Sequence, residues 1–327
     1  MKKIIAIITV LIPFTLGLKA QDASFSQFYA SPMFLHPALT GSTWCGRLTL
    51  NYRNQWPSIS GNFVNYNAAF DQSLDRINSG YGMMFNSDNM GDGAMKTSTI
   101  SGLYSYHLQV AREVYLSAGF QATYIQTKLD WNKLVFGDMI DPVSGTIGSN
   151  TLETPPANLS LGYVDFSAGA FLSFKGKFYG GFAAHHLTTP DNGFYNLTDN
   201  QLQMKLTVHG GANFIVGENA HNEPMVVSPN FLFQQQGEFH QLNMGCYVDY
   251  YPFVVGAWMR HNFENFDAAI VLVGFKHNNW KVGYSFDITM SDLSMASGGA
   301  HEISFAWEFC IERDKRRTIR TISSPAF

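Results

Sequence analysis

The sequence has little charge, few cysteines and no long hydrophobic run beyond its N-terminus. Charged residues make up 14% of the 327 residues, well below the roughly 25% of an ordinary soluble domain. Part of the surface is therefore expected to face something other than water. Beyond the N-terminus no stretch reaches the ~20 apolar residues of a spanning helix, and the mean hydropathy of -0.07 excludes a bundle of such helices. The net charge of -4 gives no reason to expect nucleic-acid binding.

The N-terminus has the features of a secretory signal peptide. Lys2 and Lys3 precede an apolar stretch from Ile4 to Leu16, and Ala20 supplies a small residue before a cleavage point. A single anchoring helix is the alternative, but the apolar stretch is short for a span. We therefore assign residues 1–20 to a signal peptide.

Apolar and polar residues alternate with period two from Trp44 onward. The clearest segment, 114–126, has one apolar face (Val114, Leu116, Ala118, Phe120, Ala122, Tyr124) and one polar or small face (Ser117, Gly119, Gln121, Thr123). A soluble β-sandwich gives the same alternation, because alternation does not say which face is wet. The segments run about 10 to 15 residues, however, which suits a tilted strand crossing a bilayer better than a soluble strand.

About fourteen such segments can be counted, and the pattern of their connections is that of a membrane barrel. The expected strands are 44–55, 62–73, 76–88, 94–109, 111–127, 161–174, 177–188, 201–217, 225–236, 238–250, 252–262, 265–277, 279–290 and 300–311. Barrels of this kind keep both ends and the short turns in the periplasm, so long and short connections should alternate, and in the main they do. The sequence thus predicts an all-β, antiparallel transmembrane β-barrel in a bacterial outer membrane, with long extracellular loops, short periplasmic turns and both termini periplasmic.

Two segments lie outside the expected barrel of residues 44–311. Residues 21–43 are rich in aromatics and proline without a clear period, and form either a periplasmic arm or a segment folded into the barrel opening. Residues 312–327 form a basic tail that we expect in the periplasm, either simply solvated or used for docking.

No residue pattern indicates catalysis. The sequence has no GxSxG elbow, HExxH helix or glycine-rich phosphate loop. His185 and His186 are adjacent, and neighbours on a strand point to opposite faces, so we expect no shared metal. His107 and His209 fall on polar faces, where a lumen-facing hydrogen-bonding role is expected. The loop 88–92 lacks the spacing of a calcium site. We predict no enzyme, no cofactor and no metal.

The three cysteines leave at least one thiol unpaired. By strand parity Cys45 and Cys310 both face the lumen, at the periplasmic ends of the first and last strands, which become neighbours when a barrel closes. Cys246 belongs to an apolar face and should see lipid. A disulfide between Cys45 and Cys310 is one hypothesis, and three free thiols are the alternative.

Several sequence patches resemble one family in their order along the chain. They read DASFSQFYASPMFLHPALTGS (22–42), NYRNQWP (51–57), LDWNKLVFGD (129–138), DFSAG (165–169), HHLTTP (185–190), GYSFDIT (283–289) and GGAHEIS (298–304). Together they resemble the PorP/SprF family of the type IX secretion system, found in gliding and adhesin-secreting Bacteroidetes. The tail departs from the family, whose members often end with Cys-Pro before a final Phe, whereas this chain ends SPAF (324–327).

The resemblance implies a non-enzymatic barrel that helps to export, or anchors, a large surface protein such as an adhesin through its type IX C-terminal domain. Other expected partners are periplasmic or outer-membrane components of the machine, and the lipid bilayer. A barrel of about fourteen strands is too narrow for a folded adhesin, which favours capture over passage. The alternatives are a channel for a small solute and, less favoured, an outer-membrane enzyme.

Two groups of residues are candidates for partner binding. The long loop offers aromatic and acidic side chains, although aromatics near strand ends are also ordinary interfacial residues. The N-terminal segment offers aromatics that could pack in the lumen or meet a periplasmic component. The candidates are Trp131, Phe136, Asp138 and Asp141 in the loop and Phe25, Phe28, Tyr29 and Phe34 in the N-terminal segment.

Overall fold

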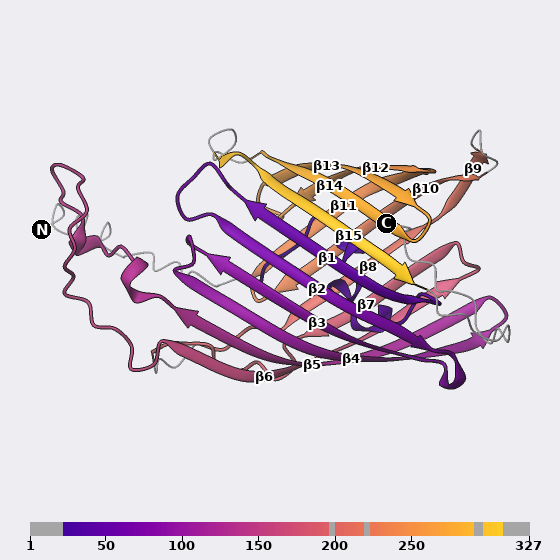
Figure 1. Ribbon diagram of the computed structural model, residues 1–327, viewed down its shortest axis with the longest axis horizontal. Coiled ribbons are helices and arrows are strands. Elements are labelled where there is room, and N and C mark those ends of the chain that lie inside the picture. The colour runs from indigo at the N-terminus through magenta and orange to yellow at the C-terminus, as the bar shows by residue number, and fades with distance from the viewer. Residues whose placement is uncertain (1–21, 196–199, 219–222, 291–296, 310–327) are drawn as a thin grey trace, which may run out of the picture.

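The computed structural model describes residues 22–195, 200–218, 223–290 and 297–309, and these ranges form one closed sheet with a chain segment inside it (Figure 1). The strands are β1 (Gly46–Gln55), β2 (Phe63–Leu74), β3 (Ser79–Met90), β4 (Met95–Ala111), β5 (Val114–Leu129), β6 (Ser160–Phe174), β7 (Phe178–His185), β8 (Lys205–Ala212), β9 (Phe214–Glu218), β10 (Pro224–Gln236), β11 (Phe239–Tyr250), β12 (Phe253–His261), β13 (Phe266–His277), β14 (Trp280–Thr289) and β15 (Ala300–Phe309). In this part of the chain, no helix is long and apolar enough to cross a membrane.

The sheet is antiparallel throughout and closes on itself. Each strand pairs with its neighbours in sequence, except that β8 and β9 do not pair with each other, and β1 pairs with β15 from Gly46 opposite Phe309 to Gln55 opposite Ala300. β8 and β9 both pair with β10 and are two halves of one barrel strand, so fifteen labelled strands make a fourteen-stranded barrel. The predicted fold class and strand number are confirmed.

The apolar face of each strand is the outer one. On β5 the Phe120 side chain is 49% exposed, whereas Ser117 is fully buried and Gln121 is nearly so. A soluble sandwich would bury the aromatic face and expose the polar one, because water is its only solvent. The exposed apolar wall is that of a barrel surrounded by lipid.

Long and tight connections fall on opposite rims of the barrel. The tight-turn rim holds turns 75–78, 112–113, 175–177, 251–252 and 278–279, and the long-loop rim holds loops 130–159 and 186–204. The loop 130–159 projects well beyond the barrel wall (Figure 1). The connection between β9 and β10 is longer than the other turns of the tight-turn rim. The turn 237–238 is shorter than the other connections of the long-loop rim.

Several expected strands differ from the structure at their ends, and the strand expected at 76–88 runs from Ser79 to Met90 after a short helical turn. The segment predicted to run to residue 188 ends at His185, because His186 adopts a left-handed backbone (φ 58°). The segment predicted from residue 201 becomes a strand only at Lys205 and is interrupted at Asn213. There the backbone N–H of Asn213 bonds the Lys177 carbonyl in the adjoining turn.

Residues 22–43, hereafter the lumen segment, lie inside the barrel. Every residue from Phe25 to Ser42 except Phe34 is buried. The lumen segment contains three short helical turns, η1 (Phe28–Ala30), α2 (Pro32–Leu35) and η2 (Pro37–Leu39). Its apolar side chains pack against buried wall residues such as Leu232 and Ile270 and form the core with them.

The lumen segment runs from one rim to the other. Asp22 contacts His186 and Gln236 at the long-loop rim, and Gly41 contacts Asp71 near the tight-turn rim, just before β1 begins. Because Phe309 ends β15 beside Gly46, the two ends of the described chain lie at opposite rims. The predicted signal peptide (1–20) and basic tail (312–327) lie outside the described residues, and the periplasmic placement of both termini stays a prediction.

Candidate functional site

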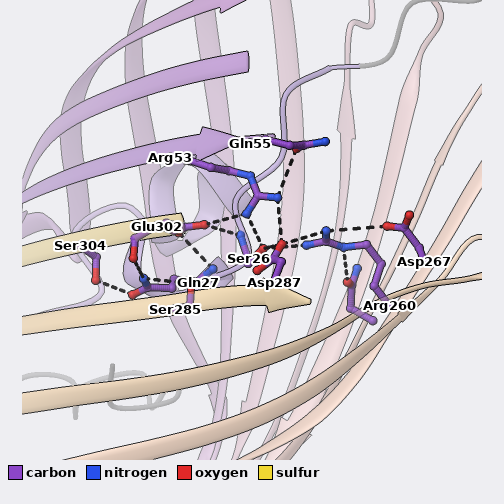
Figure 2. Close-up of polar contacts among 11 residues, drawn as sticks. Ser26, Gln27, Arg53, Gln55, Arg260, Asp267, Ser285, Asp287, Glu302 and Ser304 are labelled. Carbon is purple, nitrogen blue, oxygen red and sulfur yellow. Dashed lines mark hydrogen bonds and ion pairs between the residues drawn. The ribbon is translucent and has the colours of Figure 1, made fainter. Parts of the chain in front are cut away.

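A buried network of charges holds the start of the lumen segment (Figure 2). Arg53 on β1 and Arg260 on β12 both reach Asp287 Oδ2 on β14, at 2.9 and 3.1 Å. The same two arginines donate to the hydroxyl of Ser26, at 2.6 and 2.7 Å, and that hydroxyl donates to Asp287 at 2.6 Å. Glu302 on β15 lies 3.4 Å from Arg53 Nη1. Two cations and two buried anions thus meet around one serine of the lumen segment, and the partly exposed Asp267 lies 3.8 Å from Arg260 Nη1.

Glu302 also binds the backbone of the lumen segment directly. Its carboxylate accepts from the backbone N–H groups of Ser26 (2.7 Å) and Gln27 (3.1 Å). The Gln27 side chain donates to the Glu302 carbonyl (3.0 Å) and accepts from the hydroxyl of Ser304 (2.6 Å). Burying a carboxylate is costly unless it is paired and hydrogen-bonded. Glu302 is fully buried, so its bonds to the lumen segment stabilise both the carboxylate and the segment.

Aromatic rings fix the middle of the lumen segment. The Phe28 ring meets Trp258 edge to face, with centroids 5.2 Å apart, and the Tyr29 ring lies 6.2 Å from Tyr179 and 6.4 Å from Tyr247. Such edge-to-face pairs add about 0.5–1.5 kcal/mol to the burial of each ring. The barrel wall at this level therefore offers aromatic rings to the lumen segment.

The last turn of the lumen segment bonds a second set of wall residues. His36 Nδ1 accepts from the N–H of Ala38 (3.1 Å), which leaves Nε2 to donate to the Phe182 carbonyl (2.9 Å). Asp71 accepts from the N–H of Gly41 (2.7 Å). The segment is thus held at several levels of the lumen.

Glycines in the wall let the lumen segment approach closely. A Cβ atom at Gly119 on β5 would overlap the backbone of Pro37 and Ala38, and one at Gly80 on β3 would overlap Thr40 and Gly41. Only a residue without a side chain leaves room for another backbone at these points.

A charged clasp holds Asp22 at the long-loop rim. His186 lies between two carboxylates, with Nε2 2.7 Å from Asp22 and Nδ1 2.7 Å from Asp165. The ammonium group of Lys205 is 3.6 Å from Asp22. Burial alone would lower the pKa of His186, but Asp22 and Asp165 outweigh it and raise that pKa to about 9. The imidazole is therefore a cation at neutral pH.

The clasp predicts that replacing His186 destabilises the protein at neutral pH but not at high pH. Because its pKa is raised on folding, His186 contributes stability that is fully present below its unfolded pKa of about 6.5 and is lost as pH rises through about 9. We expect His186→Gln to cost about 3 kcal/mol at pH 6 and almost nothing at pH 10. Unfolding of both proteins in detergent across this range measures the difference. His240→Gln removes an imidazole from the same rim without touching Asp22, and a constant difference at all pH values for His186→Gln would refute the clasp.

A vestibule opens beside the lumen segment at this rim. It is a cavity of about 470 Å³ between Asp22 and Phe34 on one side and the inner wall of β3 to β8 on the other. Hydroxyl and amide groups line much of it, including Thr97, Thr127 and Gln121. Its size is that of a pocket for a small ligand or a few residues of a chain, far below that of a folded domain.

The long loop has a folded interior and exposed tips. The Trp131 and Phe136 rings lie 4.7 Å apart and are half-buried, in η4 (Trp131–Lys133) and just before η5 (Gly137–Met139). Val143 and Leu152 instead are 95% and 92% exposed.

Both loop aspartates are exposed and hold the loop through bonds to its backbone. Asp138 accepts from the backbone N–H of Leu152, which holds the pKa of that carboxyl below its usual value. Asp141 accepts from the N–H groups of Ser144 and Val143, which lower its pKa in the same way.

The predicted binding residues therefore fall into two separate groups. Phe25, Phe28, Tyr29 and Phe34 come together inside the barrel. In the loop, Trp131 and Phe136 pack against each other, whereas Asp138 and Asp141 are exposed and bond the loop backbone. Whether either group binds a partner stays a prediction. Sequence reasoning missed the charged network of Arg53, Arg260, Asp287 and Glu302. The available signal was a charge at a lumen-facing strand position, and three of these four residues lie in the patches that carry the family resemblance.

The cysteines are only partly described. Cys246 is a free, half-buried thiol on the outer face of β11. Gly46 pairs with Phe309 across the closing seam, so Cys45 and Cys310 directly adjoin a paired position in the sequence. Cys310 itself lies outside the described residues, and the Cys45–Cys310 disulfide stays a prediction.

The closed sheet, apolar outer wall and occupied lumen define an outer-membrane β-barrel. Solved structures with the same fold include the toluene transporter TbuX of Ralstonia pickettii (10% identity, 86% of this chain and 94% of that chain, TM-score 0.53). Another is the ΔS2S3 variant of TodX, a monoaromatic hydrocarbon channel (10% identity, 85% and 94%, TM-score 0.50). No curated protein sequence matches the chain.

The family comparison is more specific. Residues 17–307 match the family described as type IX secretion system membrane protein PorP/SprF. The chain belongs to this family, as its sequence patches indicated.

Proposed function

We propose that this barrel is a non-enzymatic receptor of the type IX secretion system that binds a large secreted surface protein, such as an adhesin, through its C-terminal domain. It would thereby help to export that protein or anchor it at the cell surface. Family membership supports the secretion role, and the geometry of the lumen and loops supports binding over passage.

The observation that carries the proposal is the occupied lumen. Residues 25–42 are almost entirely buried and are bonded to β1, β12, β14 and β15 at one end and to β2 and β7 at the other. A polypeptide could pass only if these bonds broke together, and leaving a buried charge without its partner costs several kcal/mol. A partner is therefore expected to bind outside, on the loops or in the vestibule.

The loop 130–159 supplies a surface suited to a protein. Its exposed large apolar residues are Val135, Ile140, Val143, Ile147, Leu152 and, at its end, Leu159. Because the loop projects beyond the barrel (Figure 1), lipid does not account for these side chains. Exposed apolar groups on an otherwise polar loop are typical of a protein contact.

Replacing the two most exposed apolar side chains of the loop with serine should weaken binding of the secreted protein. We expect Val143→Ser/Leu152→Ser to recover roughly tenfold less of the secreted protein in a mild-detergent pull-down from the native envelope, because two apolar anchors are lost. Mass spectrometry identifies the recovered protein and shows whether its C-terminal domain is the part that stays bound.

The control is Ile77→Ser, which removes an exposed apolar side chain from the tight-turn rim. It should leave recovery unchanged. The proposed receptor role of this loop would be refuted if the barrel retained only periplasmic components of the machine. It would also be refuted if the wild type and Val143→Ser/Leu152→Ser recovered the same amount of surface protein.

A channel for a small solute is the second candidate, favoured by the vestibule of about 470 Å³. The structural neighbours named above are a transporter and a channel, but a likeness at 10% identity carries only the fold. Ion conductance by the wild-type barrel in a planar bilayer would favour the channel, and a closed wild-type barrel would favour the receptor.

A further inference from the structure

Two lysines lie side by side on the outer wall near the long-loop rim. Lys96 on β4 and Lys128 on β5 are directly paired across the two strands, and both are exposed. Like charges in this position repel and destabilise a sheet. Within the described ranges neither lysine forms an ion pair with a carboxylate. The described part of the protein therefore does not supply the anion that this pair requires.

The two lysines stand at the level where lipid headgroups meet the barrel. They belong to a polar row across four strands, Asn89, Lys96, Lys128 and Ser160. Four residues further along each strand, away from the rim, the corresponding row is Phe85, Ile100, Tyr124 and Val164, each about half exposed. A change from an apolar to a polar row marks the edge of the hydrocarbon layer, where basic side chains meet lipid phosphates.

An apolar groove begins at Lys96 and runs along the outer wall. It has a volume of about 610 Å³, and Lys96 and Asn89 lie at one end. Small residues, Ala68 on β2 and Ser87 on β3, lie between larger side chains that include Tyr66 and Phe85. The groove is thus apolar along its length and cationic at its end, which matches an acyl chain joined to an anionic headgroup.

We propose that this outer wall binds a membrane lipid with a phosphate-bearing, anionic headgroup. The headgroup lies between Lys96 and Lys128 and relieves their repulsion, and one acyl chain lies in the groove over Ala68 and Ser87. The site is separate from the lumen and the loop tips, so lipid binding can be tested independently of the proposed receptor role.

Native mass spectrometry of the purified, delipidated barrel tests the site with two probes, phosphatidylglycerol and phosphatidylcholine of identical chains. We expect the wild type to retain about tenfold more of the anionic lipid, and Lys96→Gln/Lys128→Gln to abolish that preference. Ala68→Phe fills the groove and should reduce retention of both lipids. Inorganic phosphate should compete only weakly, because it has no chain to bury.

The matched control is Lys175→Gln/Lys177→Gln, which removes the same charge from the tight-turn rim. It should change the lipid preference less than twofold. The proposal is overturned if Lys96→Gln/Lys128→Gln keeps the wild-type preference, or if inorganic phosphate displaces the lipid completely. It is also overturned if the wild type forms a lipid-free dimer that Ala68→Phe dissociates, since the groove would then hold a second copy.

Discussion

Replacing Glu302 with glutamine is expected to release the start of the lumen segment and make the barrel conduct ions. The carboxylate accepts from the backbone N–H groups of Ser26 and Gln27 and pairs with Arg53. An amide of the same size cannot accept all of these bonds, and it leaves Arg53 without one of its two buried carboxylate partners. Breaking a buried pair in this way costs about 3–5 kcal/mol, so the population of the released state should rise at least roughly 100-fold. Planar-bilayer conductance and limited proteolysis near Ser26 measure the release.

The matched control lies on the same strand. Glu308 pairs with Lys281 at 2.8 Å, but both side chains are partly exposed. Such a pair contributes about 0–1 kcal/mol, and Glu308→Gln should leave the barrel closed and resistant to protease. If Glu302→Gln changed neither conductance nor proteolysis, as expected for Glu308→Gln, the charged network would not be what holds the lumen segment.

Replacing Gly119 with alanine should displace the other end of the lumen segment. The new methyl group would overlap the backbone of Pro37 and Ala38, and backbone cannot rotate away as a side chain can. Overpacking of this kind costs about 1–3 kcal/mol, which should appear as a lower melting temperature in detergent and faster cleavage after Leu39.

Gly102→Ala is the control for this substitution. Gly102 lies on the adjacent strand β4, and a Cβ there would meet nothing within 4 Å. Alanine suits a strand at least as well as glycine, so the melting temperature should stay the same or rise slightly. Equal melting temperatures for the two alanine variants would contradict the close approach at Gly119.

The fold was predictable because a membrane barrel imposes one simple rule on every strand. Lipid outside and polar groups inside force alternation over ten or more residues, and this is what residues 114–126 display. The ends of strands were harder to predict. His186 leaves β7 early through a left-handed backbone angle, and no periodic pattern records such an angle.

The interior was less predictable than the wall. Residues 22–43 have no period, so the sequence left open whether they lie in the periplasm or the lumen. Arg53, Arg260 and Asp287 meet only because the sheet closes and brings distant strands around one serine. A period-two pattern places each charge on the inner face but does not say which charges share a level.

The position of the charged network has a consequence for biogenesis. Arg53 lies on the first strand and Glu302 on the last, so the network spans the seam at which the sheet closes. A nascent barrel that lacks its final strands has no complete set of partners for Ser26 and Gln27. We therefore expect the lumen segment to bind and the last strand to pair with the first in one cooperative step. Only a correctly closed barrel then offers the lumen segment its full set of bonds.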